Sequence, residues 1–158
     1  MDVDGVLTAG DIIVLESGEE VKLWNVKDRL AFFVGRAQGL TFVWITARDS
    51  KQVKARAKDV KVDALYAACR DKKSALADLC RRFTVSPREV AYIGDDLIDL
   101  PVLRRVGLAA CPSDAPADVK RAVHYVSPLP GGRGVLRDVV ERILKAQGKW
   151  SRVLASYR

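Results

Sequence analysis

Short apolar runs recur along the chain at intervals of about 20 to 30 residues, which is the spacing that alternating strands and helices produce. These runs are residues 40–46 (LTFVWIT), 62–68 (VDALYAA), 90–96 (VAYIGDD), 107–112 (GLAACP) and 124–127 (HYVS). Each run is continuous and rich in β-branched or aromatic residues, as expected of strands that are buried on both faces. The pattern therefore predicts a set of buried strands.

Amphipathic patterns separate or follow these runs. Residues 49–60 begin with two good helix-capping residues, Asp49 and Ser50. Residues 71–83 place Ala75, Leu76, Leu79 and Phe83 on one stripe, and residues 134–148 repeat the pattern up to Gly148, as a C-cap glycine would. Strands that alternate with helices need crossover connections, so we expect an α/β fold with a central parallel sheet and helices on both faces.

One segment departs from this alternation. Residues 10–24 carry alternating apolar positions on both sides of ESGEE, with Gly18 at the tip, and this pattern predicts a β-hairpin insertion. The length of 158 residues suits one domain, residues 1–158, with residues 149–158 as a C-terminal tail.

Composition and charge exclude several classes of protein. Apolar residues make up 49% and charged residues 30% of the chain, and no apolar run approaches the roughly 18 residues of a membrane span. No signal-peptide pattern opens the chain, so we expect a cytoplasmic protein without a membrane partner. The three cysteines, Cys69, Cys80 and Cys111, are widely spaced, which favours reduced thiols over a disulfide framework or a zinc site.

The net charge of +7 has two interpretations. The basic residues are scattered and are not interleaved with aromatic residues, which favours solvated helix faces and no nucleic-acid partner. An anionic substrate is the other interpretation that fits this charge.

Polar side chains gather where the predicted strands end. In a parallel α/β sheet, ligands bind beyond the carboxyl ends of the strands. These positions hold acidic residues, one hydroxyl and one ammonium: Asp2, Asp4, Thr46, Lys72, Asp95, Asp96 and Asp99. Clustered carboxylates without histidine or cysteine favour Mg²⁺.

This set suits phosphoryl transfer. One carboxylate can attack phosphorus as the nucleophile, and a second can act as general acid and base. The lysine and the hydroxyl can hold the phosphoryl oxygens. Singly, Thr46 could be a strand-end hydroxyl, Lys72 a solvated lysine and the acidic turns helix caps or calcium-loop fragments; their joint placement favours the chemical interpretation.

The residues also resemble a known family. DVDGVLT, WITAR, Lys72 and GDDLID are similar, in this order, to the four motifs of the haloacid dehalogenase superfamily of phosphatases. The longer stretches NVKD, AYIGDDLIDLPVL, VGLAACPSDA and GGRGVLRDV resemble the 3-deoxy-D-manno-octulosonate 8-phosphate phosphatases. The resemblance implies a Rossmann-like three-layer core without a large cap domain. It also implies a Mg²⁺-dependent homotetramer in lipopolysaccharide sugar synthesis, whose subunits close one another's sites, and the 10–24 hairpin is the candidate for this role.

The resemblance assigns roles position by position. Asp2 would be the nucleophile and a metal ligand, and Asp4 the general acid and base that also gives its carbonyl to Mg²⁺. Asp95 would be the other metal carboxylate, with Asp96 or Asp99 behind it, and Thr46 and Lys72 would hold the phosphoryl group. The substrate-binding positions would be Asn25, Val26, Lys27, Asp28, Arg48, Arg56 and Arg133.

Departures from the family pattern leave alternatives open. Arg29 and Leu30 stand where smaller residues are usual, and Phe33 where an arginine is common, so a nine-carbon sialic-type sugar phosphate is a second candidate substrate. The family's first aspartate ends a central buried strand, and only Met1 precedes Asp2. We therefore expect a gap in the middle of the sheet, and a non-catalytic oligomeric relative is a further alternative.

Overall fold

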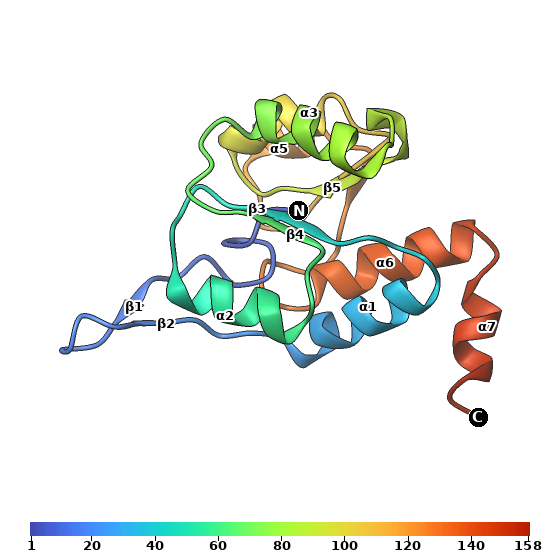
Figure 1. Ribbon diagram of the computed structural model, residues 1–158, viewed down its shortest axis with the longest axis horizontal. Coiled ribbons are helices and arrows are strands. Elements are labelled where there is room, and N and C mark those ends of the chain that lie inside the picture. The colour runs from blue at the N-terminus through green and yellow to red at the C-terminus, as the bar shows by residue number, and fades with distance from the viewer.

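The computed structural model describes residues 1–158 and has strands in its middle layer with helices on both sides (Figure 1). The strands are β1 (Ile13–Val14), β2 (Glu20–Val21), β3 (Val43–Ile45), β4 (Ala64–Tyr66), β5 (Ala91–Ile93), β6 (Leu108–Cys111) and β7 (Tyr125–Val126). The α-helices are α1 (Val26–Ala37), α2 (Lys51–Asp59), α3 (Lys72–Phe83), α4 (Leu100–Leu103), α5 (Ala117–Lys120), α6 (Val135–Ala146) and α7 (Trp150–Ala155). Two short 3₁₀ helices, η1 (Pro87–Glu89) and η2 (Leu97–Asp99), flank β5.

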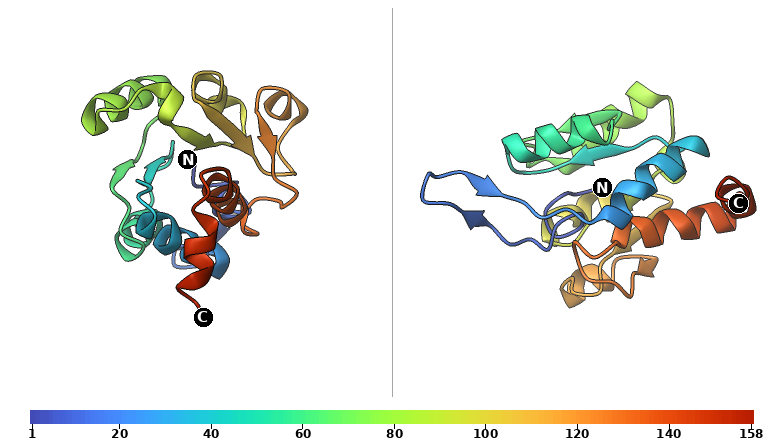
Figure 2. Two further views of the ribbon diagram at one scale, coloured as in Figure 1. Left: turned by 90° about the vertical axis from the view of Figure 1, so that its right-hand side faces the viewer. Right: turned by 90° about the horizontal axis from the view of Figure 1, so that it is seen from below.

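The central strands run parallel, which confirms the predicted α/β class. β3 pairs with β4 so that Trp44 lies opposite Leu65, and β6 pairs with β5 on one side and with β7 on the other. Helices α3, α4 and α5 cover one face of the strands, and α1, α2 and α6 cover the other (Figure 2).

The core is divided between these two faces. Successive strand residues point to opposite sides, so Trp44 packs with residues of α1, α2 and α6, whereas Ile45 packs with residues of α3, α4 and α5. The same division separates Ile93 from Tyr92 on β5. The two apolar layers hold the sheet edge rigidly where the predicted site residues lie.

The first two residues connect the two halves of the sheet. The Met1 amine donates to the Val43 carbonyl at 3.0 Å, and the Ile45 N–H donates to the Met1 carbonyl at 2.9 Å. The Asp2 N–H donates to the Ile93 carbonyl at 2.9 Å, so the chain begins between β3 and β5. Behind Met1 lies a mostly apolar cavity of about 850 Å³, between β3 and β5 and over α6. The expected gap in the middle of the sheet is therefore present.

Helix α1 was not predicted. Asn25 caps it by accepting the Lys27 N–H at 2.8 Å, but its inward face carries a buried carboxylate, Asp28, and a glycine, Gly35. A side-chain carbon at Gly35 would lie 2.5 Å from the Phe42 ring, so the glycine allows α1 to approach the strand. An acid and a glycine in the buried stripe conceal the helical pattern in the sequence.

The hairpin and the C-terminal segment lie outside the central layers. β1 and β2 pair antiparallel with Ile13 opposite Val21, and their connection extends away from the body of the protein (Figure 1). The last residues, taken as a tail from the sequence, contain helix α7, whose Val153 is buried and whose Trp150 lies under the Arg137 guanidinium. No helix has both the length and the hydropathy needed to cross a membrane.

Candidate active site

A buried lysine lies between two carboxylates at the carboxyl ends of β3 and β5. Lys72, at the start of α3, is 1% exposed, and its ammonium lies 2.8 Å from Asp2 Oδ2 and 2.7 Å from Asp99 Oδ1. Burial opposes the charge on Lys72, but these two carboxylates outweigh it and raise its pKa above the ordinary value. Lys72 is therefore a fixed positive charge directly beside Asp2.

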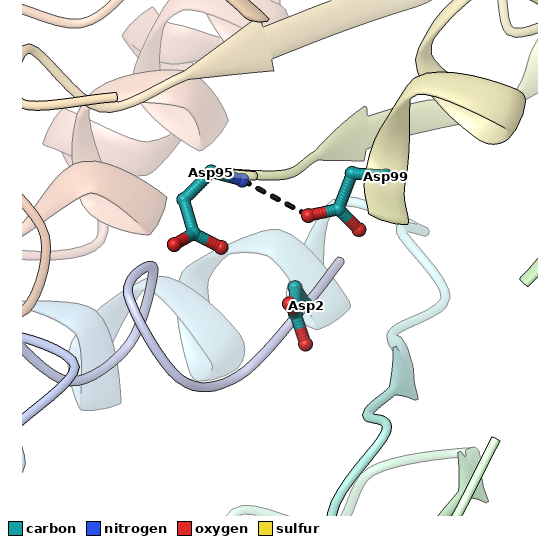
Figure 3. Close-up of side chains that lie close together, drawn as sticks. All are labelled: Asp2, Asp95 and Asp99. Carbon is teal, nitrogen blue, oxygen red and sulfur yellow. Dashed lines mark hydrogen bonds between the residues drawn. The ribbon is translucent and has the colours of Figure 1, made fainter. Parts of the chain in front are cut away.

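Asp99 is held by four donors. Its Oδ1 accepts from Lys72 and from the Tyr92 hydroxyl at 2.7 Å, and its Oδ2 accepts the N–H groups of Asp95 at 3.1 Å and of Asp96 at 3.3 Å (Figure 3). A carboxylate offers about four lone-pair positions, so these contacts use the hydrogen-bonding capacity of Asp99. Asp99 thus fixes Lys72 and the turn that carries Asp95.

Asp2 and Asp95 carry more negative charge than their neighbours compensate. Burial, followed by the proximity of Asp99, raises the pKa of Asp2 to about 6. Burial, followed by the proximity of Asp2 and Asp99, raises the pKa of Asp95 to about 8. Asp95 Oδ1 is buried without a hydrogen-bond partner, and the acidic groups of Asp2, Asp95 and Asp99 each present one oxygen within 4.8 Å of the others. Buried, crowded carboxylate oxygens without enough positive charge are the ligands that fit Mg²⁺.

A glycine makes room for this carboxylate. Gly5 has a φ of +84°, and a side-chain carbon there would lie 1.9 Å from Asp95 Oδ2. The 3–8 turn that Gly5 permits also brings Asp4 and Thr8 over the site, where the Thr8 hydroxyl donates to Asp4 Oδ1 at 3.3 Å.

The hairpin supplies the partners of Asp4. Lys22, which follows β2, forms a hydrogen-bonded ion pair with Asp4 Oδ1, and its side chain is only 3% exposed. Arg48 forms an ion pair with Glu20 of β2, and its Nε lies 3.9 Å from Asp4 Oδ2. Asp4 Oδ2 itself is buried without a hydrogen bond. Lys22 and Glu20 were missed from the sequence, because their partners are more than 15 residues away and no local pattern marks them.

Thr46 ends β3 and is 1% exposed. Its hydroxyl oxygen accepts the Arg48 N–H at 3.2 Å, so the 46–48 turn is closed on itself. This arrangement keeps the Thr46 hydroxyl proton free for an acceptor and orients Arg48 toward the hairpin.

A glycine-rich loop closes the opposite side of the 3–8 turn. Side-chain carbons at Gly131 and Gly132 would lie 2.1 Å from the Gly5 carbonyl and 2.6 Å from the Ala9 nitrogen. Asn25 Nδ2 donates to the Gly132 carbonyl at 3.3 Å. The loop therefore packs against the turn between Asp2 and the hairpin.

The chain matches known hydrolases over most of its length. The model of the haloacid dehalogenase-like hydrolase family matches residues 65–137. The 3-deoxy-D-manno-octulosonate 8-phosphate phosphatase of Escherichia coli K12 is 40% identical over 150 residues, which cover 94% of this chain and 79% of that protein. The chain belongs to the 3-deoxy-D-manno-octulosonate 8-phosphate phosphatase family. Its resemblance to this family, found from the motifs, is thus confirmed.

Solved structures of 3-deoxy-D-manno-octulosonate 8-phosphate phosphatases share the fold. The Moraxella catarrhalis enzyme, in complex with magnesium, phosphate and 3-deoxy-D-manno-octulosonate, is 34% identical and superposes with a TM-score of 0.97 over 100% of this chain and 91% of that chain. The cobalt-bound enzyme of Haemophilus influenzae is 35% identical, with a TM-score of 0.90 over 94% of this chain and 86% of that chain. These matches confirm the predicted core without a large cap domain.

The predicted substrate residues of this phosphatase family member are in different environments. Val26, Lys27 and Arg133 are exposed, whereas the Arg56 guanidinium pairs with Asp59 at 2.6 Å and lies over the Trp24 ring. Asp96 is exposed, and its carboxylate accepts the Leu97 N–H at 2.7 Å, so it caps η2 and lies outside the group formed by Asp2, Asp95 and Asp99.

Asp28 is 3% exposed, and its Oδ1 accepts the Arg137 N–H at 2.9 Å, at the start of α6. Burial raises its pKa to about 6, against the opposing effect of backbone donors from Arg137, Gly134 and Leu136. Asp28 therefore joins α1 to the helix that follows the glycine-rich loop.

Proposed function

We propose that this chain hydrolyses 3-deoxy-D-manno-octulosonate 8-phosphate to 3-deoxy-D-manno-octulosonate and phosphate, as a Mg²⁺-dependent phosphomonoesterase. The observation that carries the proposal is the buried Lys72 ammonium held between Asp2 and Asp99, beside the uncompensated Asp95. The 40% identity to phosphatases of this specificity supports the substrate. A cytoplasmic role in lipopolysaccharide sugar synthesis, predicted from the sequence, is part of the proposal.

In the first step, an Asp2 carboxylate oxygen attacks the phosphorus and the bond from phosphorus to the sugar oxygen breaks, which forms an aspartyl-phosphate. Lys72 and the Thr46 hydroxyl hold the phosphoryl oxygens as negative charge shifts onto them. Asp4 donates its proton to the departing sugar oxygen. Asp4 is held for this role by Lys22 and Thr8, with Arg48 alongside.

In the second step, water attacks the aspartyl-phosphate. Asp4, now ionised, accepts a proton from this water, and phosphate leaves with Asp2 restored. We assign Mg²⁺ to the carboxylates of Asp2 and Asp95 and to the Asp4 carbonyl. When bound, Mg²⁺ supplies the positive charge that allows an anionic carboxylate to approach an anionic phosphate.

Asp99 and Asp96 receive positioning roles in this proposal. Asp99 accepts four hydrogen bonds and orients Lys72, and Asp96 caps η2. Arg48 and Arg133, next to Asp4 and in the glycine-rich loop, are proposed to bind the sugar acid.

We further propose a homotetramer assembled through the hairpin. The hairpin exposes apolar side chains that a monomer would leave in water: Ile12 is 55%, Val14 58% and Leu23 71% exposed. Sedimentation of the native chain tests this proposal, with I12K/V14K expected to give smaller species.

The function is tested by turnover of purified protein on a panel of sugar phosphates, with and without Mg²⁺. The octulosonate 8-phosphate is expected to be hydrolysed fastest and a nine-carbon sialic-type phosphate more slowly. Asp2→Asn should reduce kcat by at least about 1,000-fold, because it removes the nucleophile. Asp118→Asn, on the exposed Asp118 that pairs with Arg121, is the matched control and should keep full activity. Activity that survives in Asp2→Asn would refute the mechanism.

A further inference from the structure

A concave basic surface lies at the end of the sheet opposite the active site. Its cavity of about 630 Å³ lies where η1 precedes β5, where α4 turns into β6, and where the chain enters β7. The lining consists of Arg88, Leu103, Arg104, Arg105, Val106, Gly107, Ala122 and His124, and it contains no carboxylate. The amino ends of the strands thus carry a cavity that the proposed phosphatase chemistry does not use.

The arginines of this cavity have no acidic partners. Seven other arginines of the chain lie within 4.0 Å of a carboxylate, on Arg29, Arg36, Arg48, Arg56, Arg81, Arg121 and Arg137. Arg88, Arg104 and Arg105 form no such pair, and Arg105 makes only one hydrogen bond, from Nη1 to the Pro101 carbonyl at 2.6 Å. Three guanidinium groups on one concave surface repel one another, and a bound anion would relieve this repulsion.

The backbone holds these elements in place. The Gly107 N–H donates to the Pro87 carbonyl at 3.0 Å, and a side-chain carbon at Gly107 would lie 1.9 Å from the Arg88 carbonyl oxygen. Glycine at this position therefore lets η1 approach the end of α4. As a result, Arg88 shares one cavity with Arg104 and Arg105.

His124 adds an oriented neutral donor. Its Nδ1 accepts the Ala109 N–H at 2.9 Å, and its own N–H donates to the Ala109 carbonyl at 3.0 Å, so the imidazole is fixed against β6. Because Nδ1 accepts, the proton of the neutral ring is on Nε2, where it is available to a ligand.

We propose that this cavity is a second anion site, which binds the dianionic phosphate group of a small phosphorylated metabolite. Planar guanidinium groups bind phosphate oxygens through paired hydrogen bonds, and the imidazole Nε2–H supplies a further donor. The volume exceeds that of inorganic phosphate and lies in the range of small-ligand sites, so it accommodates a phosphate ester rather than the bare ion. This site is independent of the proposed reaction.

The single histidine of the chain makes the test local. Its imidazole carbon-bound proton signals report on this cavity alone in an NMR titration with inorganic phosphate at pH 8, without Mg²⁺. We expect these signals to shift with saturation under phosphate and to stay in place under sodium chloride of equal ionic strength. A shift that does not saturate, or that chloride reproduces, would overturn the proposal.

Variants separate a built site from bulk charge. R88Q/R104Q/R105Q should weaken phosphate binding at least tenfold, whereas R82Q/R152Q/R158Q, which removes the same charge elsewhere, should change it less than threefold. R88K/R104K/R105K keeps the charge and should restore part of the binding. Equal losses in the two glutamine triples would contradict the site, as would phosphate binding that persists in the first.

Two readouts keep the result distinct from other functions. Mg²⁺-dependent phosphatase turnover should be unchanged in R88Q/R104Q/R105Q, so loss of the second site and failure of the proposed function give different results. A 12-base-pair DNA duplex that binds the cavity more than tenfold tighter than phosphate, compared at equal phosphate-group concentration, would assign the surface to nucleic acid and refute the proposal.

Discussion

The slot between β3 and β5 predicts that an added strand will stabilise this chain. The carbonyls of Val43 and Ile93 already accept hydrogen bonds from Met1 and Asp2 across the slot. Because the N–H and C=O of one strand residue point to the same side, the N–H groups of Val43 and Ile93 also face the slot. The perturbation is therefore an extension of five apolar residues, Val-Ile-Leu-Val-Ile, placed directly before Met1.

The expected gain follows from the geometry of the slot. Met1 lies opposite Trp44, and the lining reaches back to Gly39, so about five residues at roughly 3.3 Å each fit the slot. Up to four new hydrogen bonds contribute about 1 kcal/mol each. Three or four buried side chains contribute about 2 kcal/mol each. Ordering five residues costs about 1.5 kcal/mol each, which leaves a net gain of about 4 kcal/mol, or roughly 10 °C in Tm.

The assay is thermal unfolding by circular dichroism, with an extension of Ser-Gly-Asn-Ser-Gly as the control of equal length. A second readout comes from pH, because burial lowers the pKa of the Met1 amine to about 5 and the extension converts this amine to an amide. In the parent chain the unfolded amine binds its proton between about pH 5 and 8 and the folded amine does not, so this group makes the parent more stable as pH rises. The advantage of the apolar extension should therefore shrink from pH 5 to pH 8. Equal Tm values for the apolar and polar extensions would refute the reasoning.

Three further predictions concern the active site. Tyr92→Phe removes one of the four donors to Asp99 and should cost about 2 kcal/mol of stability and roughly tenfold in kcat, measured against Tyr66→Phe, whose hydroxyl bonds the partly exposed Asp78. Lys22→Met should lower kcat at least about tenfold by releasing the general acid, with Lys54→Met as an exposed control, and unchanged kcat would exclude a role for the hairpin lysine. The raised pKa of Asp95, about 8, gives metal-free protein stability that is full below about pH 3.8 and is lost as pH rises through 8. Calorimetric Mg²⁺ affinity should accordingly rise with pH and level off above about 8, and a pH-independent affinity would contradict this assignment.

The sequence predicted the parallel core well because its strands are buried on both faces. Runs such as 90–96 have few polar residues before the turn, so both their position and the acidic residues at their ends are visible without a structure. Lys72 could be proposed for a related reason. It begins an amphipathic helix after a predicted strand, and the first turn of that helix lies at the carboxyl edge of the sheet.

The parts that were missed depend on partners distant in sequence. Lys22 alternates with apolar residues on β2 and after it, as any solvated hairpin lysine would, and only the fold shows that Asp4 receives it 18 residues away. Tyr92 was counted as an apolar strand residue, although a buried tyrosine needs a partner for its hydroxyl, and this requirement alone could have directed attention to Asp99.

Asp28 shows how such a distant contact changes an interpretation. The resemblance places it in a substrate-binding stretch, yet its carboxylate accepts a backbone N–H from Arg137, 109 residues away. The same interaction explains why α1 was not predicted, because an acid in the buried stripe of a helix is tolerated only where another helix supplies donors. One carboxylate therefore both conceals a helix in the sequence and joins α1 to α6. Since the glycine-rich loop precedes α6 and packs on the turn of Asp2 and Asp4, Asp28 can influence the substrate site through that loop without touching the substrate.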